Sequence, residues 1–369
     1  MRIILTGGGT GGHIYPALAF AKYMKSNIPG TEILYIGGER GLEGKLVPEA
    51  GLPFESIELQ GFKRSLSPSN IKTVALFLKS LKRAKTLIQT FQPDVVIGTG
   101  GYVSGSVMYQ ASKMGIPTIV HEQNSVPGMT NKFLSKHATA IATSFKQVSA
   151  YFPKAKKVVY TGNPRAEEVA SIEKSDILTE FGLNTNKPTA VIFGGSQGAL
   201  KINQALVEAL PKFNGKPYQI LYASGERYYK EFESVFENAA KEMDNISILP
   251  YISRMPEVLA NASLMVGRSG ATSIAEITAL GLPAIFIPSP YVTNDHQTKN
   301  AKALVDTGAA KLILDEELNG ETLVQAIDSV FCEPSVLKEM SEASTGLGVK
   351  DANQRLYKLA KEIIGEKHE

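Results

Sequence analysis

Glycine, threonine and histidine residues near the start of the chain form its first stretch of chemical interest. Residues 6–13, TGGGTGGH, follow a short apolar run and lead into a helical pattern. Backbone N–H groups of such a loop can approach a phosphate closely, and the following helix adds the positive end of its dipole. The glycines satisfy G-x-G-x-x-G, but Glu39 comes late for the acidic residue that holds the ribose of a dinucleotide. The loop therefore suits another phosphate, a reacting hydroxyl or a tight turn without a ligand better than a dinucleotide.

His13 ends this loop at the expected start of the helix, where a dehydrogenase would normally have a small residue. Histidine exchanges protons near neutral pH, and a helix N-terminus favours its neutral, proton-accepting form. His13 is therefore the candidate general base, and Glu122 is the rival. The alternative for His13 is that it caps the helix or binds a phosphate without moving a proton.

The second half of the chain contains another glycine-rich loop of this kind. Residues 193–200, FGGSQGAL, follow an expected strand and precede an expected helix, and residues 98–105, GTGGYVSG, form a third such loop. One loop in each half, facing each other across a cleft, is what an enzyme needs to transfer a group between two substrates. Glu276 follows a Ser-Gly turn and could accept both hydroxyls of a ribose, although a lone glutamate on a helix is usually just solvated. The polar stretch 291–301 suits recognition of sugar hydroxyls.

Short runs of Val, Ile and Leu alternate with helical patterns along the whole chain, which indicates βαβ units and parallel sheets covered on both faces. Expected strands lie near residues 2–6, 32–36, 94–98, 117–121, 139–142 and 157–161 in the first half, and near 189–194, 218–223, 246–249, 263–267, 283–287 and 311–314 in the second. The predicted fold class is α/β, with two Rossmann-like domains whose parallel sheets face a central cleft. We predict domains over 1–163 and 164–341, and a C-terminal helical segment over 342–369 that returns to the first domain.

Composition and charge restrict the class of protein. A chain of 369 residues favours two domains. Residues 1–163 contain 19 Lys and Arg against 8 Asp and Glu, whereas residues 164–369 contain 20 against 28, so the two halves are expected to have different partners. The single cysteine, Cys332, excludes an intramolecular disulfide and suits a reducing cytosol. Glycines and a proline interrupt the uncharged stretch 3–21, which argues against a membrane span and a signal peptide.

Residues 70–91 predict a basic helix, and no acidic residue lies between Glu58 and Asp94. The expected core side of this helix consists of Val74, Leu78, Leu81 and Ile88. The expected membrane patch, which would contact an anionic lipid surface, consists of Lys72, Leu76, Phe77, Lys79 and Lys82. The alternative is a solvated helix packed on its own domain. Nucleic acid is disfavoured as a partner, because the aromatic residues are not interleaved as stacking platforms.

Seven motifs follow one another along almost the entire chain: TGGGTGGHIYPALA, GTGGYVSGSV, HEQNSVPGMTN, TGNPR, GGSQGA, RSGATSIAEITALGLPAIFIP and DHQTKNA. In these motifs and their order the chain resembles the MurG family of bacterial transferases, which are similar to other GT-B glycosyltransferases. The resemblance implies the GT-B fold, with UDP-N-acetylglucosamine as donor and lipid I, undecaprenyl-diphospho-N-acetylmuramoyl-pentapeptide, as acceptor. It implies transfer to the 4-hydroxyl of the muramoyl sugar with inversion, giving lipid II, and neither a cofactor nor an obligatory metal.

The same resemblance implies a role for individual residues. Thr10, Gly11 and Gly12 would lie at the donor sugar and meet the acceptor diphosphate. Asn124 would bind a hydroxyl of N-acetylglucosamine, and Arg165 would lie at the uridine-diphosphate end of the donor. The other implied donor contacts are Ser196 and Gln197 for the diphosphate, Ile252 for uracil, Ala271 and Thr272 at the start of a helix beside the donor, Glu276 for the ribose and Gln297 for sugar hydroxyls.

Since the acceptor carries a long lipid, the resemblance implies a peripheral enzyme at the cytoplasmic face of the cell membrane. Its further partners would be other proteins of cell-wall synthesis and division. Three alternatives stay open: a diacylglycerol glycosyltransferase of the same fold, a UDP-N-acetylglucosamine 2-epimerase, and a non-catalytic sugar-nucleotide sensor. An acceptor assay separates the first, the basic helix and the HEQN motif argue against the second, and detectable turnover would exclude the third.

Overall fold

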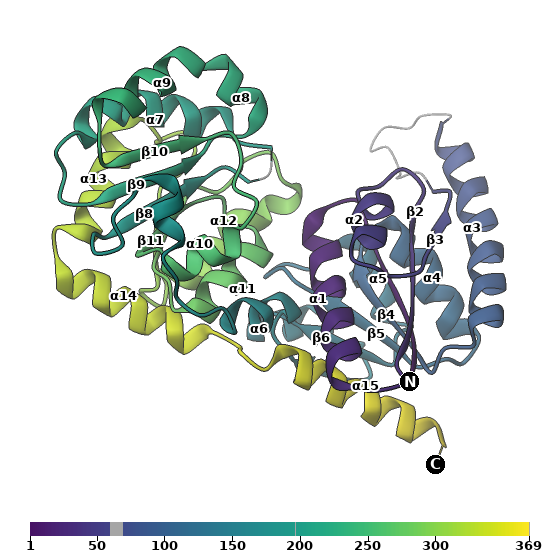
Figure 1. The fold of residues 1–369 in the computed structure, drawn as a ribbon. Coiled ribbons are helices and arrows are strands. Elements are labelled where there is room, and N and C mark those ends of the chain that lie inside the picture. The colour runs from purple at the N-terminus through teal and green to yellow at the C-terminus, as the bar shows by residue number, and fades with distance from the viewer. Residues whose placement is uncertain (60–68, 196, 369) are drawn as a thin grey trace. The chain divides into compact units, whose positions relative to one another are not determined.

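A computed structural model describes residues 1–59, 69–195 and 197–368 (Figure 1). The side chains of residues 69–72, 74, 293 and 366–368 lie outside that description. The chain divides into two compact units: unit 1 contains Met1–Glu167 together with Asp351–Glu369, and unit 2 contains Glu168–Lys350. This division falls slightly later than the predicted boundary after residue 163, and residues 342–350 belong to unit 2.

Unit 1 is built on a parallel sheet with the strand order β3-β2-β1-β4-β5-β6-β7. Its strands are β1 (Arg2–Gly7), β2 (Glu32–Gly38), β3 (Phe54–Ile57), β4 (Val95–Gly100), β5 (Thr118–Glu122), β6 (Ala140–Thr143) and β7 (Val158–Tyr160). Its helices are α1 (Gly11–Asn27), α2 (Glu43–Glu49), α3 (Ser69–Phe91), α4 (Tyr102–Lys113), α5 (Met129–Leu134), the 3-10 helix η1 (Lys146–Tyr151) and α15 (Ala352–His368), and α6 (Pro164–Ala170) crosses the boundary between the units.

Helices cover both faces of this sheet, which explains why its strands are apolar throughout. Successive side chains of a strand point to opposite faces. Ile3 and Leu5 of β1 accordingly pack in one cluster with α1 and α15. Ile4, between them, packs in a second cluster with α3 and α4. The continuous apolar runs of the sequence therefore have a direct physical cause.

Unit 2 has a second parallel sheet, with the strand order β10-β9-β8-β11-β12-β13. Its strands are β8 (Thr189–Phe193), β9 (Gln219–Ala223), β10 (Ile246–Leu249), β11 (Leu264–Gly267), β12 (Ala284–Phe286) and β13 (Ala310–Leu312). Its helices are η2 (Ile177–Phe181), α7 (Leu200–Phe213), α8 (Glu226–Glu231), α9 (Glu233–Glu242), α10 (Met255–Asn261), α11 (Ala271–Leu280), η3 (Thr293–Asp295), α12 (His296–Val305), α13 (Gly320–Phe331) and α14 (Pro334–Leu347).

The predicted α/β class with two parallel sheets is confirmed, and each expected strand is present to within two residues at its ends. Strand β3 was not predicted. Its run FESI is only four residues long and includes an exposed serine, so neither alternation nor a continuous apolar run marks it. It pairs with the end of β2 at the edge of the sheet.

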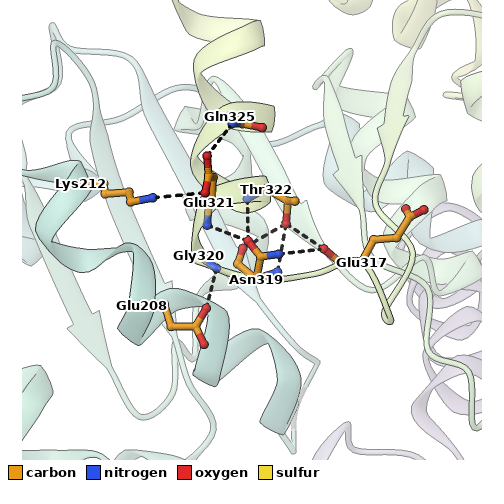
Figure 2. Close-up of polar contacts among 8 residues, drawn as sticks. All are labelled: Glu208, Lys212, Glu317, Asn319, Gly320, Glu321, Thr322 and Gln325. Carbon is orange, nitrogen blue, oxygen red and sulfur yellow. Dashed lines mark hydrogen bonds and ion pairs between the residues drawn. The ribbon is translucent and has the colours of Figure 1, made fainter.

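A capping box fixes the start of α13 (Figure 2). The side-chain oxygen of Asn319 accepts the N–H groups of Glu321 at 2.9 Å and Thr322 at 3.0 Å, and Thr322 Oγ1 accepts the N–H of Asn319 at 3.0 Å. Glu208 of α7 accepts the N–H of Gly320 at 2.8 Å. These bonds satisfy donors that a helix start leaves free and tie α13 to α7.

Candidate active site

The predicted site residues of unit 1 follow the carboxyl ends of its strands. All strands of the sheet are parallel, so these ends share one edge. The first glycine loop, residues 6–13, follows β1, and the third glycine loop, residues 98–105, follows β4. The strand order reverses between β1 and β4, and ligands of open α/β sheets bind at such a switch point. The fold therefore places both loops where a ligand is expected.

His13 lies half-buried in the first turn of α1. Its Nδ1 lies 2.9 Å from the carbonyl oxygen of Gly8. A carbonyl oxygen can only accept, so in the neutral ring Nδ1 carries the hydrogen and Nε2 keeps the lone pair. A Cβ on Gly100 would lie 2.9 Å from Nε2, which shows that the glycine there makes room for the ring. The neutral imidazole is thus oriented to accept a proton at Nε2.

The first and third glycine loops pack backbone against backbone. The N–H of Gly8 donates to the carbonyl of Gly100 at 3.2 Å. Thr99 Oγ1 donates to the carbonyl of His13 at 2.7 Å. Gly101 has a φ of 86°, and a Cβ on it would lie 2.5 Å from the carbonyl oxygen of Gly8, so only glycine fits. The third glycine loop therefore helps to set the position of the His13 turn.

Glu122 is buried at the end of β5. Its Oε1 accepts the N–H of Asn124 at 3.0 Å, and its Oε2 accepts the N–H of Gly128 at 3.1 Å and Asn131 Nδ2 at 2.8 Å. These bonds shape the turn that carries Asn124, the predicted sugar contact. Both carboxylate oxygens of Glu122 are thus used within its own turn, and the choice between His13 and Glu122 as the base stays a prediction.

Glu43, to which no sequence motif pointed, lies against the first glycine loop with only 2% of its surface exposed. Its Oε2 accepts the N–H of Gly9 at 3.0 Å, and its Oε1 accepts the N–H of Gly38 at 2.8 Å. Tyr35 donates its hydroxyl to the carbonyl of Gly7 at 2.9 Å. Burial, and then the negative charge of Glu43, raise the pKa of Tyr35 above its usual range. The only signal in the sequence is a glutamate within a second glycine-rich turn, GGERGLEG.

Arg165 lies in unit 1, whereas the predicted boundaries assign it to the second domain. Its guanidinium carbon lies 5.7 Å from the ring centroid of Tyr15 on α1, within the range of a cation–π contact. Its N–H donates to Asn163 Oδ1 at 3.1 Å. The arginine therefore lies beside the helix that carries His13, and its contact with uridine diphosphate stays a prediction.

In unit 2, the second glycine loop, residues 193–200, lies between β8 and α7. Asn203 of α7 is fully buried, and its Nδ2 donates to the carbonyls of Ala199 at 3.0 Å and Ser224 at 3.2 Å. The amide therefore ties the loop after β8 to the loop after β9. Gln197 is exposed, and Ser196 lies outside the described residues. The strand order of this sheet reverses between β8 and β11, so the second glycine loop also lies at a switch point.

The other predicted donor residues follow the carboxyl ends of β10, β11 and β12: Ile252, Ala271, Thr272, Glu276 and Gln297. Ile252 and Ala271 are buried, and the other three are half-buried. The Thr272 hydroxyl is buried without a hydrogen-bond partner among the described residues. Gln297 Oε1 accepts the N–H of Ser289 at 2.8 Å, which orients its amide. The fold of unit 2 thus gathers these residues at one sheet edge, and their contacts with a donor stay predictions.

Arg268 fastens the loops after β11 and β12, and no motif suggested this role. Its Nη1 donates to the carbonyls of Ile287 and Pro288 at 2.9 Å each and to Asp315 Oδ1 at 2.6 Å. The Arg268 and Asp315 side chains are 12% and 16% exposed, so water screens this ion pair little. These bonds tie the loop after β11 to the loops after β12 and β13.

Helix α3 begins one residue before the predicted range 70–91 and ends at its last residue. The predicted core position of Leu78 is wrong, because that side chain is 62% exposed. Among the described side chains of the helix, the buried ones are Thr73, Ser80, Ala84, Leu87 and Ile88, whereas the predicted core residue Val74 has its side chain outside the description. Ser80 donates its hydroxyl to the carbonyl of Phe77 at 2.6 Å, so its burial leaves no unpaired donor.

The predicted membrane patch is only partly exposed. Lys79 and Lys82 are exposed, Leu76 and Phe77 are half-buried, and the side chain of Lys72 lies outside the described residues. Lys79 pairs with Glu58 at 3.3 Å. Beside the patch, Arg83 pairs in the same way with Glu55 at 2.8 Å. Both pairs are exposed and therefore weak, so they reduce the local positive charge without closing the surface to lipid.

Two further properties concern the described residues as a set. None of their helices combines the length and the hydropathy that crossing a bilayer requires. Within the same residues, no group of three or more His, Cys, Asp or Glu side chains is placed to hold a metal ion.

Known proteins match the chain over nearly its whole length. The N-terminal and C-terminal domain models of glycosyltransferase family 28 match residues 3–143 and 189–356. The UDP-N-acetylglucosamine--N-acetylmuramyl-(pentapeptide) pyrophosphoryl-undecaprenol N-acetylglucosamine transferase of Leuconostoc mesenteroides is 54% identical over 367 residues, covering 99% of this chain and 100% of the relative. That of Lactococcus lactis strain MG1363 is 53% identical, covering 98% and 99%.

The crystal structure of Acinetobacter baumannii MurG matches with a TM-score of 0.79 at 30% identity, covering 98% of this chain and 99% of that chain. A Neisseria meningitidis UDP-GlcNAc 2-epimerase bound to UDP-GlcNAc reaches a TM-score of 0.69 over 98% and 100% of the two chains, but at 14% identity it shares the fold alone. The chain therefore belongs to the MurG family of glycosyltransferases, with the GT-B fold, within glycosyltransferase family 28.

Proposed function

We propose that this chain transfers N-acetylglucosamine from UDP-N-acetylglucosamine to the 4-hydroxyl of the muramoyl sugar of lipid I, with inversion, giving lipid II. The observation that carries the proposal is the orientation of His13. Its Nδ1 lies 2.9 Å from the carbonyl oxygen of Gly8, which leaves the lone pair on Nε2 and supports His13 as the proton acceptor at the switch point of unit 1. The names of relatives that are more than 50% identical support the choice of donor and acceptor.

A single displacement accounts for the reaction. The acceptor oxygen forms a bond to the anomeric carbon while the bond from that carbon to the diphosphate oxygen breaks, and the electron pair of the broken bond leaves with UDP. The proton of the acceptor hydroxyl passes to His13 Nε2. Thr10, Gly11 and Gly12 meet the acceptor diphosphate and the donor sugar, and Asn124 holds a hydroxyl of that sugar.

Unit 2 binds the donor in this proposal. The carboxylate of Glu276 accepts the ribose hydroxyls, the backbone of Ile252 contacts uracil, and Gln297 binds the sugar. Negative charge grows on the departing UDP. Backbone N–H groups of the second glycine loop, the N-terminus of the 14-residue helix α7 and Arg165 stabilise that charge, so the chemistry requires neither a metal nor a cofactor.

Lipid I lies in a membrane, so we place the chain at the cytoplasmic membrane face as a peripheral enzyme that meets other cell-wall synthesis and division proteins there. The exposed lysines of α3 and the exposed apolar side chain of Leu78 support contact with anionic lipid. No helix in the described part of the chain needs to span the bilayer for this contact.

Incubation with labelled UDP-N-acetylglucosamine and lipid I, followed by mass and NMR analysis of the product, tests the proposal. The expected product is lipid II with a β-linked N-acetylglucosamine, because inversion starts from the α-linked donor. A glycosylated diacylglycerol formed instead of lipid II would point to the related lipid transferases. Conversion of the donor to its 2-epimer without any lipid would point to an epimerase.

A further inference from the structure

A buried carboxylate is connected to the candidate base through one peptide group of the first glycine loop. The carbonyl of Gly8 and the N–H of Gly9 belong to the same peptide. The carbonyl accepts the Nδ1–H of His13 at 2.9 Å, and the N–H donates to Glu43 Oε2 at 3.0 Å. Carboxylate, peptide and imidazole therefore form one continuous hydrogen-bonded chain.

The carboxylate of Glu43 is also hydrogen-bonded on the side that faces away from the His13 ring. Its second oxygen accepts the N–H of Gly38 at 2.8 Å. A Cβ on Gly8 or on Gly41 would collide with the carboxylate, so glycines at these positions provide the space that it fills. Glu43 is 2% exposed, and water therefore screens its charge little. The Glu43 carboxylate therefore keeps one orientation relative to the Gly8–Gly9 peptide.

Hydrogen bonds in series polarise one another. A carboxylate that accepts from the N–H of Gly9 increases the partial negative charge on the carbonyl oxygen of Gly8. That oxygen faces Nδ1 of His13, where positive charge appears once Nε2 has taken a proton. A carboxylate does the same for the histidine of a Ser-His-Asp triad by direct contact.

We infer that Glu43 is a positioning residue for the transfer reaction. Acting through the Gly8–Gly9 peptide, it fixes the Nδ1–H form of the His13 ring and stabilises the imidazolium. Near the ring, Thr10 Oγ1 lies 3.5 Å from Nδ1, and the guanidinium of Arg165 lies over Tyr15 of the same helix. The inference rests on the proposed function only for the role of His13 as the base.

The state of the ring is measured first, on the full chain without substrate. Nitrogen NMR distinguishes the two neutral forms of histidine, and the signal of His13, one of five histidines, is assigned by its loss in His13→Asn. We expect Nδ1 to carry the hydrogen in the wild type. We also expect the imidazole to become protonated only at lower pH in Glu43→Gln, because the imidazolium has lost its supporting charge. An Nε2–H ring in the wild type, or an unmoved titration in folded Glu43→Gln, overturns the inference.

Turnover is then measured in a double-mutant cycle. Glu43→Gln should lower kcat on the order of 10-fold, part of what a general base contributes, and should move the acidic limb of the kcat profile to lower pH. The KM for UDP-N-acetylglucosamine should stay unchanged. In a His13→Ala background the same substitution should change kcat less than about two-fold, because residues that act as a unit are not additive. An equal loss in both backgrounds would show a merely structural role.

Two control variants distinguish an effect of the Glu43 charge from a general loss of stability. Glu49→Gln alters an exposed glutamate of the same helix and should match the wild type. Tyr35→Phe removes a hydrogen bond to the neighbouring Gly7 but leaves the Gly8–Gly9 peptide intact, so it should lower stability without moving the His13 titration. If Glu43→Gln does not fold, two measurements still test the inference. They are the neutral form of the His13 ring in the wild type and the titration of His13 in Glu43→Asp, which keeps the charge. Full turnover in His13→Ala would overturn the proposed base but not the link from Glu43 to the ring.

Discussion

Glu276 and His13 divide the expected chemistry between the two units, and each can be removed without touching the other. Glu276→Ala should weaken UDP binding, since a charged acceptor of the ribose hydroxyls is worth roughly 1.5–3 kcal/mol, or about 10- to 150-fold in affinity. Calorimetric titration with UDP measures the effect. Glu237→Ala, on the exposed side of α9, is the matched control. Equal affinities of the wild type and Glu276→Ala would exclude the ribose contact.

His13→Ala should lower kcat by about 100- to 10,000-fold, the range for loss of a general base. Affinity for UDP should stay near that of the wild type, because the predicted contacts with UDP itself, other than Arg165, belong to unit 2. Turnover with lipid I and calorimetry with UDP together check both statements. Near-normal turnover would return the base assignment to Glu122 or to solvent.

Single residues also show what a sequence can and cannot reveal. His13 was predicted as the base from its place at the end of a glycine loop, which is a feature of sequence order, and that role stays a prediction. Glu43 acts through backbone N–H groups that come from two other segments, and such partners have no side-chain signature. The fully bonded state of Glu122 was hidden for the same reason.

Among the elements, α13 offers a clean test of local stability. Asn319→Ala should cost about 1 kcal/mol, because the N–H groups of Glu321 and Thr322 lose their acceptor (Figure 2). Asn319→Asp keeps an acceptor and should stay close to the wild type. Urea unfolding followed by circular dichroism compares the three proteins, and a loss of equal size in Asn319→Asp would contradict the capping role.

Helix α3 carries the prediction for the membrane. Replacing Lys72, Lys79, Lys82 and Lys85 together by Gln should strongly reduce binding to anionic vesicles, since each basic residue near such a surface contributes about 1 kcal/mol. Co-sedimentation at low and high salt measures this, and the difference from the wild type should shrink at high salt. Activity on a short-chain, water-soluble acceptor should persist.

A mutant that sediments like the wild type at low salt would show that α3 is only a solvated surface. The docking face would then have to be sought around Lys132, Phe133 and Lys136. Lys79→Gln alone should have less effect than Lys82→Gln, because Lys79 is already paired with Glu58.

The error about Leu78 shows why this helix was hard to orient from sequence. Apolar residues occur on more than one side of α3, and hydrophobic periodicity favours leucine over serine for the core. In the structure Ser80 is buried, which the bond from its hydroxyl to its own helix permits, while Leu78 is exposed. The long periodic elements of both sheets were predictable, because continuous burial leaves no such ambiguity.

At the scale of the whole molecule, His121 links stability to pH. It is fully buried, with Nε2 2.9 Å from the carbonyl of Gly162 and Nδ1 3.1 Å from Gln123 Nε2. Burial lowers its pKa to about 4, and the bond to Gly162 opposes that change only in part. A histidine in an unfolded chain titrates near pH 6.5. Below that pH, His121 therefore binds a proton in the unfolded chain but not yet in the folded chain.

The free energy of unfolding should therefore be fully retained above about pH 6.5 and should fall as the pH drops toward about 4, with a loss of about 2 kcal/mol at pH 5. Urea unfolding at pH 7.5 and pH 5, monitored by a probe in unit 1, measures the loss. His121→Gln cannot titrate and should show a smaller difference between the two pH values. An identical difference in wild type and variant would assign the pH dependence to other groups.

Helix α15 closes the core of unit 1, where Leu356, Leu359 and Ile363 pack in one cluster with Phe20 and Met24 of α1. The whole of unit 2 is encoded between these two helices. On the ribosome, α1 is therefore made before unit 2 but completed after it: α1 leaves the exit tunnel long before its partner exists, while unit 2 can fold as soon as residue 350 has emerged. A chaperone that binds the nascent chain would find an apolar target on α1, and would have to release it only after α15 has emerged.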